Sequence, residues 1–220
     1  MSMHSFMAHL VPLLAPFLDA RFADPRQIPH PVRCIGAAYR VLEKPARASG
    51  HERIMGVACV LVVGGCACFL AQSLAGLPYV GMLFALCLSF AGLAMGTLLR
   101  EVEIALAAIE SGELEQARAA VGMLVSRDTV NLERNELCRA LAESVSENFN
   151  DALVAPFFWL LLGGPGGLWA YKAVSTADSM WGYTTLKWRD LGWAGARLDD
   201  VLAWVPARLS AFFLLIGSYV

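Results

Sequence analysis

The chain has 220 residues, of which 57% are hydrophobic and only 16% are charged. Its mean hydropathy of +0.55 is higher than that of an ordinary soluble domain. The 17 basic and 19 acidic side chains nearly balance, so neither a disordered chain nor a protein that binds DNA or RNA is expected. An uncharged stretch at residues 54–99 is long enough for two bilayer crossings of about 20 residues each. The composition therefore predicts an all-α, polytopic integral membrane protein.

The first apolar segment, residues 5–18, contains Pro12 and Pro16 and has no basic region before it. A signal peptide is therefore not expected. The segment is short for a full crossing, which leaves open a spanning helix or a helix that lies in the membrane interface.

The six cysteines form no CxxC pair, and no histidine stands beside them. Cysteines placed in this way are typical of small core residues rather than of a metal or redox site. We expect free thiols that pack in the core and no disulfide framework.

A Gly-Leu-Pro sequence at residues 76–78 divides the uncharged stretch. It predicts helices over 54–75 and 79–99 that form a transmembrane hairpin with a tight turn. Both ends of such a hairpin face the same side of the membrane. The flanking segments 21–53 and 100–151 are rich in Lys and Arg, and the positive-inside rule places them in the cytoplasm.

Residues 100–151 are charged and have apolar side chains at helical spacing. We expect a soluble, cytoplasmic helical insertion of two or three helices within a single membrane domain that covers residues 1–220. One amphipathic helix is predicted to begin at Asp128 or Thr129 and to run to about Phe149, because either side chain can cap exposed N–H groups.

Residues 152–171 carry no charge, but residues 163–167 consist only of glycine and proline. About 11 residues of uninterrupted helix are left, which is roughly half a bilayer. The segment is predicted either to span as a broken helix or to re-enter, and irregular backbone at that depth needs protein or a watery cavity around it. A last apolar segment begins near Val201 and contains Pro206 and Arg208.

Glu143, Glu147 and Asp151 are spaced four residues apart, so a helix would place them along one face with Asn148 beside them. Three like charges repel one another, and a Mg²⁺ ion or an arginine is expected among them. The alternative is a solvated helix face that includes Arg139.

The next predicted helix is strongly amphipathic. Its polar side carries a lysine, a carboxylate and several hydroxyls just after the glycine-rich break, a mixture suited to phosphate oxygens and a bound metal ion. These residues are Tyr171, Lys172, Ser175, Thr176, Asp178, Ser179 and Tyr183. The alternative is a helix with one wetted face.

Arg208 lies within an apolar segment, where an unpaired guanidinium is costly. Asp199 or Asp200 is the expected partner, and a side chain that snorkels to the interface is the alternative. His30 stands between two prolines, where a structural hydrogen bond is favoured over a ligand role.

The polar motifs follow one another in a specific order and spacing from Leu14 onward. They are Asp24-Pro25, His30-Pro31-Val32, Gly36, Arg127-Asp128-Thr129, Glu143-Ser144, Glu147-Asn148, Asp151, Ala155-Pro156, Gly163-Gly164-Pro165, Tyr171-Lys172-Ala173-Val174, Thr176, Asp178-Ser179-Met180, Gly182-Tyr183, Arg197-Leu198-Asp199-Asp200 and Pro206-Ala207-Arg208. This series resembles the membrane proteins of cobalamin biosynthesis that act as adenosylcobinamide-phosphate synthase, the CbiB/CobD family.

The sequence departs from this family at Ser175, where asparagine is usual, and at Thr184-Thr185, where a Lys-Asn pair is usual. Family members also continue with a further soluble segment and a closing membrane helix. If that segment builds the active site, a chain without it is expected to be inactive or to need a second polypeptide.

The resemblance implies that ATP drives amide formation between a propionate of adenosylcobyric acid and the amine of (R)-1-aminopropan-2-ol O-phosphate. Such a ligation needs Mg²⁺ and cationic groups around the phosphates. By this resemblance the metal or amine contacts are Glu147, Asp151, Asp178, Asp199 and Asp200, with Mg²⁺ on Glu147, Asp151 and Asp178. The phosphate contacts are Arg127, Lys172, Arg197 and Arg208, and further substrate contacts are His30, Asn148, Thr176 and Ser179.

The expected location is the bacterial inner membrane, with several crossings. The expected partners are the corrinoid, the amino-alcohol phosphate and membrane lipid, with a homo-oligomer or other cobalamin-pathway enzymes left open. Two other functions are weighed against the ligase: an inactive scaffold or sensor of the same family, and a transporter, which the few crossings and the lack of an internal repeat disfavour.

Overall fold

The computed structural model describes residues 3–22 and 30–218. Every regular element within these ranges is helical: α1 (Met3–Phe22), α2 (Pro31–Ala48), α3 (Glu52–Ala75), α4 (Gly81–Gly92), α5 (Met95–Glu110), α6 (Leu114–Gly122), α7 (Arg134–Phe149), the π-helix η1 (Asn150–Val154), α8 (Ala155–Trp181) and α9 (Trp193–Gly217). Four helical stretches are long and apolar enough to cross a membrane: Glu52–Ala75, Gly81–Glu110, Arg134–Trp181 and Trp193–Gly217. The prediction of an all-α, polytopic membrane protein is confirmed.

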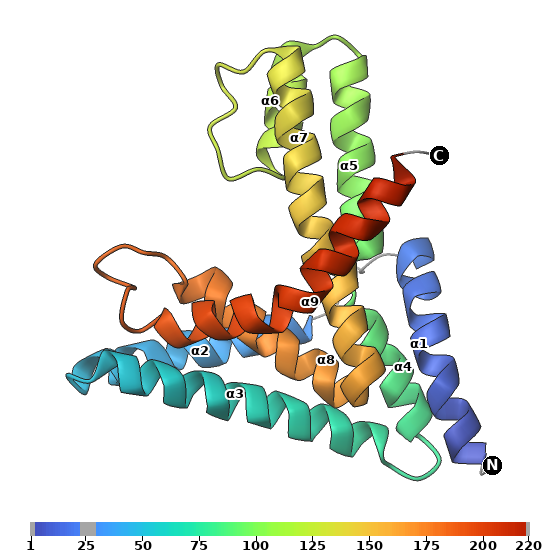
Figure 1. The fold of residues 1–220 in the computed structure, drawn as a ribbon, viewed down its shortest axis with the longest axis vertical. Coiled ribbons are helices and arrows are strands. Elements are labelled where there is room, and N and C mark those ends of the chain that lie inside the picture. The colour runs from blue at the N-terminus through green and yellow to red at the C-terminus, as the bar shows by residue number, and fades with distance from the viewer. Residues whose placement is uncertain (1–2, 23–29, 219–220) are drawn as a thin grey trace.

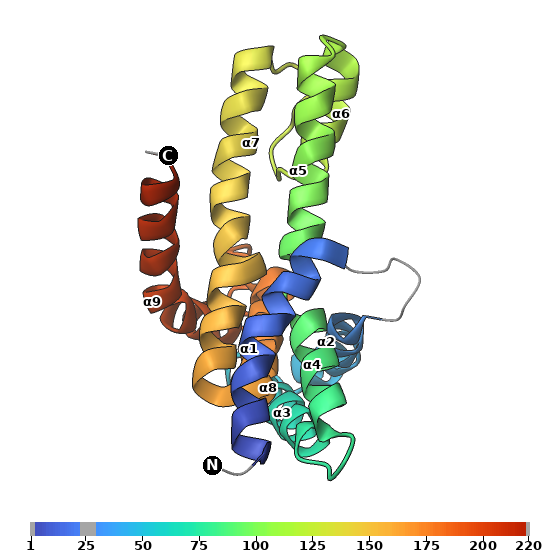
Figure 2. The same cartoon turned by 90° about the vertical axis from the view of Figure 1, so that its right-hand side faces the viewer.

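The helices form two groups that lie at opposite ends of the long axis (Figures 1 and 2). Helices α5, α6 and α7 project together from one end. Helices α1 to α4 and α8 pack at the other end, and α9 crosses from this group toward the first one. The helices that hold most of the apolar sequence therefore lie together, apart from the charged ones.

The projecting group covers most of residues 100–151, and the soluble, cytoplasmic character of this insertion stays a prediction. Its three helices enclose a small core of their own, made of Ala105, Ile109, Ala117, Val121, Leu137, Ala140 and Leu141. Helix α7 begins at Arg134, later than the predicted start at Asp128 or Thr129. The prediction was wrong because Glu133 and Glu136 form a capping box at that point, whereas the Thr129 hydroxyl donates to the Arg118 carbonyl, 2.9 Å away.

The predicted hairpin is present as α3 and α4 with a turn between them, but its second helix ends at Gly92 instead of residue 99. The chain leaves the helix at Leu93 and Ala94, and the Ala94 N–H donates to the Ala152 carbonyl, 2.9 Å away. Helix α5 then starts under the fully buried Asp19, whose Oδ2 accepts hydrogen bonds from the N–H groups of Met95 (2.7 Å) and Gly96 (3.2 Å). Asp19 thus caps α5 from another helix.

Helix α8 folds back on itself, as the glycine-rich sequence predicted. Gly164 has φ 61° and ψ −159°, a combination open essentially to glycine alone. The break separates a first limb, residues 155–163, from a second limb, residues 165–181. The Lys172 ammonium lies 3.5 Å from the Asp151 carbonyl oxygen, although 21 residues of straight helix would span about 30 Å. The chain therefore turns back sharply at Gly164, and the second limb runs obliquely toward α2 (Figure 1).

The second limb packs in the main core against α3 and α2. The fully buried Tyr39 donates its hydroxyl to the Ala173 carbonyl, 3.0 Å away, and its ring meets Trp181 edge-on at 4.9 Å. Burial raises the pKa of Tyr39 well above its ordinary value, so the hydroxyl keeps its proton. Gly56 on α3 lets the backbone of Leu191 approach, because a Cβ there would lie 2.1 Å from the Leu191 carbonyl oxygen.

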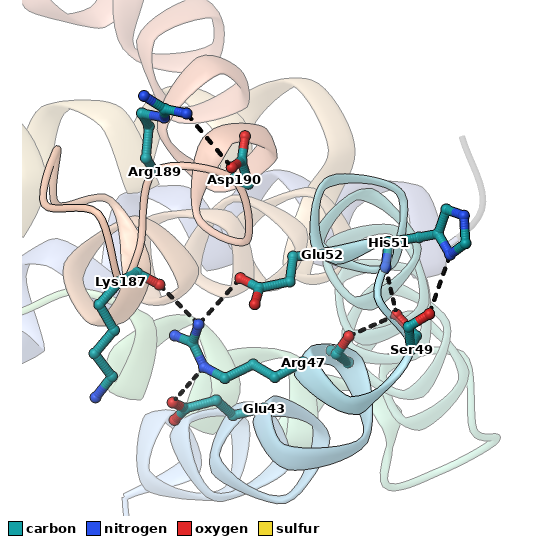
Figure 3. A network of polar contacts seen from close by, with 9 residues as sticks. Glu43, Arg47, Ser49, His51, Glu52, Lys187, Arg189 and Asp190 are labelled. Atoms are coloured by element: carbon teal, nitrogen blue, oxygen red, sulfur yellow. Dashed lines mark hydrogen bonds and ion pairs between the residues drawn. The ribbon is translucent and has the colours of Figure 1, made fainter.

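The segment that follows α8 is fastened to the corner between α2 and α3 by Arg47 (Figure 3). The Arg47 guanidinium donates to Glu43 (3.1 Å), Glu52 (3.0 Å) and the Lys187 carbonyl (2.7 Å). It also lies over the Trp188 ring, 4.5 Å from its centre. The segment after the second limb is therefore attached to both α2 and α3.

All six cysteines are free, as predicted. Only Cys59 is buried, however, and Cys34, Cys66, Cys87 and Cys138 are exposed. The prediction that the cysteines pack in the core was thus wrong for most of them, because Cys66 and Cys87 lie on helix faces that no described helix covers.

Helix α1 continues through both Pro12 and Pro16. It is not one of the four helical stretches among the described residues that are long and apolar enough to cross a membrane. Whether α1 spans the bilayer or lies in the interface therefore stays open.

Candidate functional site

The fold-back of α8 brings together four carboxylates from three separate segments. Asp151 comes from η1, Asp178 from the second limb, and Asp199 and Asp200 from the first turns of α9. Asp199 interacts electrostatically with the other three, and Asp178 interacts with Asp151 and Asp200. We call these four residues the carboxylate cluster. Carboxylates that interact in this way repel one another, which favours binding of a cation or an ammonium group among them.

Buried polar atoms without a partner lie at the same place. Tyr171 is 1% exposed, and its hydroxyl lies within electrostatic reach of Asp151 and Asp199. Among the described residues, that hydroxyl, the Asn150 Oδ1 and the Asp199 Oδ1 accept or donate no hydrogen bond. Unpaired buried polar atoms are costly and rare, so three of them around one cluster indicate a place for a polar ligand.

The π-helix η1 turns Asp151 toward this cluster. A π-turn adds one residue to the helical turn and is frequent at functional sites. The Asn150 amide donates to Asp151 Oδ1, 2.8 Å away, and holds its carboxylate. Because η1 begins directly after α7, the predicted straight stack of Glu143, Glu147 and Asp151 does not continue through it.

Lys172 supplies a cation at the edge of the cluster. Its ammonium approaches the Asp151 carbonyl from the second limb at 3.5 Å. Thr176 and Ser179 stand on the same limb, and their hydroxyl protons go to the carbonyls of Lys172 (2.6 Å) and Ser175 (2.9 Å). Their oxygen lone pairs remain available to a ligand.

Glu147, Asn148 and Arg127 lie at a second place, in the projecting group. They line a polar cavity of about 320 Å³ between α7 and the segment before it, together with Ser126, Glu143 and Ser144. Arg127 forms an ion pair with Glu143, so an arginine lies beside one of the three acids, which was one of the two partners expected for them. The sequence-predicted site residues thus divide between two places.

No three His, Cys, Asp or Glu side chains in the part of the chain that the structure describes are arranged to hold a metal ion. The carboxylate oxygens of the cluster do suit Mg²⁺, which is commonly held by one or two carboxylates together with water and substrate phosphates. The Mg²⁺ site predicted at Glu147, Asp151 and Asp178 therefore stays a prediction, with Asp151 and Asp178 placed together in the cluster.

Arg208 does not pair with Asp199 or Asp200 as expected. Its guanidinium stacks on the Trp204 ring, 3.6 Å from the ring centre, and donates to the Trp204 carbonyl, 2.6 Å away. Its partner is thus an aromatic ring one turn earlier on the same helix, and Arg208 itself is exposed. Arg197 lies nearer the cluster, 3.8 Å from the Asp200 carboxylate, and both side chains are largely exposed.

His30 caps α2. Its Nδ1 accepts a hydrogen bond from the Val32 N–H, 3.3 Å away, and its ring lies 6.5 Å from the Trp169 ring. The structural interpretation of this histidine is therefore supported by the geometry. The neighbouring Asp24-Pro25 motif lies outside the described residues.

The fold and the site together define a polytopic helical membrane protein with a carboxylate and lysine site at a folded-back helix. Residues 12–220 match the family described as CobD/Cbib protein. The chain belongs to the CobD/CbiB family.

Curated relatives agree with this assignment. The chain is 41% identical over 215 residues to cobalamin biosynthesis protein CobD of Pelobacter propionicus, which covers 92% of this chain and 64% of that protein. It is 37% identical to the protein of the same name from Listeria monocytogenes serovar 1/2a (92% and 67% covered) and 38% identical to that of Klebsiella pneumoniae (91% and 66%). The chain thus spans about two thirds of the length of these relatives. No solved structure matches it.

Proposed function

We propose that this chain acts in cobalamin biosynthesis and joins adenosylcobyric acid to (R)-1-aminopropan-2-ol O-phosphate in an ATP-dependent ligation. The observation that carries the proposal is that the Lys172 ammonium lies 3.5 Å from the Asp151 backbone carbonyl, beside the carboxylate cluster at the fold-back of α8. Membership of the CobD/CbiB family and the names of its relatives support the pathway.

The ligation has two bond-forming steps. A propionate oxygen of the corrinoid attacks the γ-phosphorus of ATP, which gives an acyl phosphate and ADP. The amine nitrogen then attacks the acyl carbon, inorganic phosphate leaves, and the nitrogen loses a proton as the amide forms. Lys172 stabilises the negative charge of the phosphoryl group, and a carboxylate of the cluster accepts the proton.

The carboxylates of the cluster also suit the Mg²⁺ ion and the substrate ammonium group that the reaction needs. Mg²⁺ would be held by Asp151 and Asp178 and would neutralise charge on the ATP phosphates. Asp199 and Asp200 remain for the ammonium of the amino-alcohol phosphate. The buried Tyr171 hydroxyl and the side-chain amide oxygen (Oδ1) of Asn150 are the polar atoms that a bound substrate would satisfy.

ATP is a cytoplasmic substrate, so the site is proposed to face the cytoplasm of a bacterial inner membrane. The fold-back supports this orientation because it places Asp151 and Lys172 side by side instead of on opposite ends of one crossing. In a chain whose six native cysteines are replaced, a Ser179→Cys variant should resist an impermeant thiol reagent added outside intact cells. Labelling from outside would contradict the proposed orientation.

The activity is tested with membranes that carry the 220-residue chain, adenosylcobyric acid, aminopropanol phosphate, ATP and Mg²⁺. We expect adenosylcobinamide phosphate as the product and its loss with Asp178→Ala. Asp190→Ala is the matched control, because Asp190 is exposed and lies 3.9 Å from Arg189, its ion-pair partner outside the cluster. Absence of product from well-inserted wild-type chain would contradict the ligase, and product undiminished by Asp178→Ala would contradict the site.

A further inference from the structure

Gln72 carries a polar amide in a long and mainly apolar helix, and it touches the backbone where α8 reverses. It stands on α3 in the uncharged stretch 54–99. Its Oε1 accepts a hydrogen bond from the Gly166 N–H, 3.3 Å away. Polar side chains in transmembrane segments are expensive and are usually retained for a specific contact.

The reversal at Gly164 creates a need for such a contact. The second limb begins there as a new helix, and the first N–H groups of a helix have no acceptor within it. Pro165 removes one of these donors because it has no N–H, and Gly166 is the next donor. In a membrane an unsatisfied backbone donor is costly, and Gln72 supplies the acceptor from a neighbouring helix.

The glycines at the reversal allow this approach. A Cβ on Gly166 would lie 2.9 Å from Gln72 Oε1 and 3.1 Å from the Cys68 carbonyl oxygen. Gln72 also lines a cavity of about 560 Å³ beside the reversal, together with Gly164 and Pro165. The side chain thus lies at the tip of the fold-back, where the direction of the second limb is determined.

The second limb carries the catalytic groups of the proposed reaction. Lys172 follows Gly166 by less than two helical turns and meets Asp151, while Tyr39 fixes the limb at Ala173 and Arg47 fixes the segment after it. We infer that Gln72 is a positioning residue that sets the register of the second limb and thereby places Lys172 against Asp151. The effect on catalysis rests on the proposed function, whereas the effect on the fold-back does not.

The geometry is tested first, without any assay of activity. Spin labels at Leu162→Cys and Tyr183→Cys, in a chain whose six native cysteines are replaced, report the distance between the first limb and the end of the second. Both side chains are exposed. Gln72→Met keeps the length of the side chain without its acceptor, Gln72→Glu keeps an acceptor oxygen, and Ser73→Ala is the control.

We expect one narrow distance distribution for the parent chain, Gln72→Glu and Ser73→Ala, and a broad or displaced one for Gln72→Met. Gln72→Asn, which retains the amide but is one methylene shorter, provides a milder variant with the same expected direction if Gln72→Met does not fold. A narrow parental distribution in both Gln72→Met and Gln72→Asn would overturn the inference.

Activity provides the second measurement. Gln72→Met should lower kcat at least tenfold with little change in the KM for ATP, and Gln72→Glu should restore most of it. Lowered kcat that Gln72→Glu fails to restore, beside a narrow parental distance distribution, would overturn the positioning role. If the parent chain has no ligase turnover, the proposed function fails, and the distance measurement still decides the role of Gln72.

Discussion

Two of the helical stretches that are long enough to cross a membrane, Gly81–Glu110 and Arg134–Trp181, each contain a break in the helical conformation, and the two breaks have different origins. At Gly164 the sequence itself provides the break, because glycine and proline surround a residue with φ 61°. At Leu93 and Ala94 neither residue is a helix breaker. There the break is held by Ala152, whose carbonyl accepts from Ala94, and by Asp19, which caps α5.

The consequences of the breaks differ as well. The break at Gly164 reverses the chain and brings Lys172 to Asp151. The break after Gly92 lets α5 continue into the projecting group, which has a core of its own. The break at Gly164, which has a local cause, thus builds the candidate site. The break at Leu93 and Ala94 is held by distant partners and joins the site to the projecting group, because Ala152 belongs to the same η1 segment as Asp151.

Gly164→Ala should have the largest effect of the single changes, because it acts on the break that builds the site. A non-glycine residue in this backbone conformation costs about 1–3 kcal/mol, and relief of that strain would move the second limb. We expect a lower unfolding temperature in detergent and a loss of ligase activity of about 100-fold or more, since a displacement of about 1 Å can cost that much.

Gly163→Ala is the matched control for this prediction. Gly163 has no positive φ, and a Cβ there would meet no atom within 4 Å. Equal effects of the two substitutions would show that the Gly164 conformation is not what holds the fold-back.

Asp19→Ala should destabilise the other break. Two N–H groups, those of Met95 and Gly96, would lose their acceptor, and a buried donor without a partner costs about 1–3 kcal/mol. Asp19→Asn keeps one acceptor oxygen and should cost less. The measurement is unfolding in detergent together with ligase activity, and activity should fall less than in Gly164→Ala. A larger loss of activity from Asp19→Ala would reverse the comparison between the breaks.

Tyr39→Phe should weaken the attachment of the second limb by about 1 kcal/mol, the usual net value of one hydrogen bond, because the Ala173 carbonyl loses its donor. Burial raises the pKa of Tyr39, so its folded state favours the neutral hydroxyl. The stabilisation is present below about pH 10, the ordinary tyrosine pKa, and is lost as pH rises above it. Unfolding measured against pH should show this loss in the parent chain and a weaker one in Tyr39→Phe.

Tyr183→Phe is the control for that measurement. Tyr183 is 58% exposed, so its hydroxyl is removed from the surface and not from the core. It should leave both the stability and its alkaline pH dependence unchanged. If stability falls at high pH as much in Tyr39→Phe as in the parent chain, the loss of stability comes from groups other than Tyr39.

The sequence predicted features whose cause is local. The hairpin turn before Tyr79, the break at 163–167 and the amphipathic second limb all follow from glycine, proline and apolar spacing. The break at Leu93, the start of α7 at Arg134 and the Trp204 partner of Arg208 were missed or wrong, because each depends on a contact that the spacing does not encode. Gln72 could have been noticed as the polar amide in an apolar span, but only the fold shows that it meets Gly166.

The candidate site followed the same rule. Asp151, Asp178, Asp199 and Asp200 were selected singly from their motifs, yet their meeting depends on the chain reversal and on η1. Glu147 was grouped with Asp151 by its spacing of four, which assumes a regular helix. The π-turn after Phe149 makes that assumption fail, so Glu147 lines the cavity beside Arg127 instead.

Arg127→Gln should have the smallest effect on stability. Any change in its kinetics would therefore report on substrate binding by the projecting group and not on unfolding. The ion pair of Arg127 with Glu143 is exposed, with 53% and 61% of the side chains accessible, and exposed pairs contribute only about 0–1 kcal/mol. Glu143→Gln removes the same ion pair by changing its other member.

If Arg127 serves only the ion pair with Glu143, the two variants should have equal and nearly parental unfolding and kinetics. If Arg127 binds a substrate phosphate, as the family resemblance implies, only Arg127→Gln should raise the KM for ATP or for the amino-alcohol phosphate, by about tenfold for a lost charge-assisted hydrogen bond. Equal kinetics in both variants would confine phosphate binding to the fold-back, and a selective rise in KM would make the cavity in the insertion part of the site.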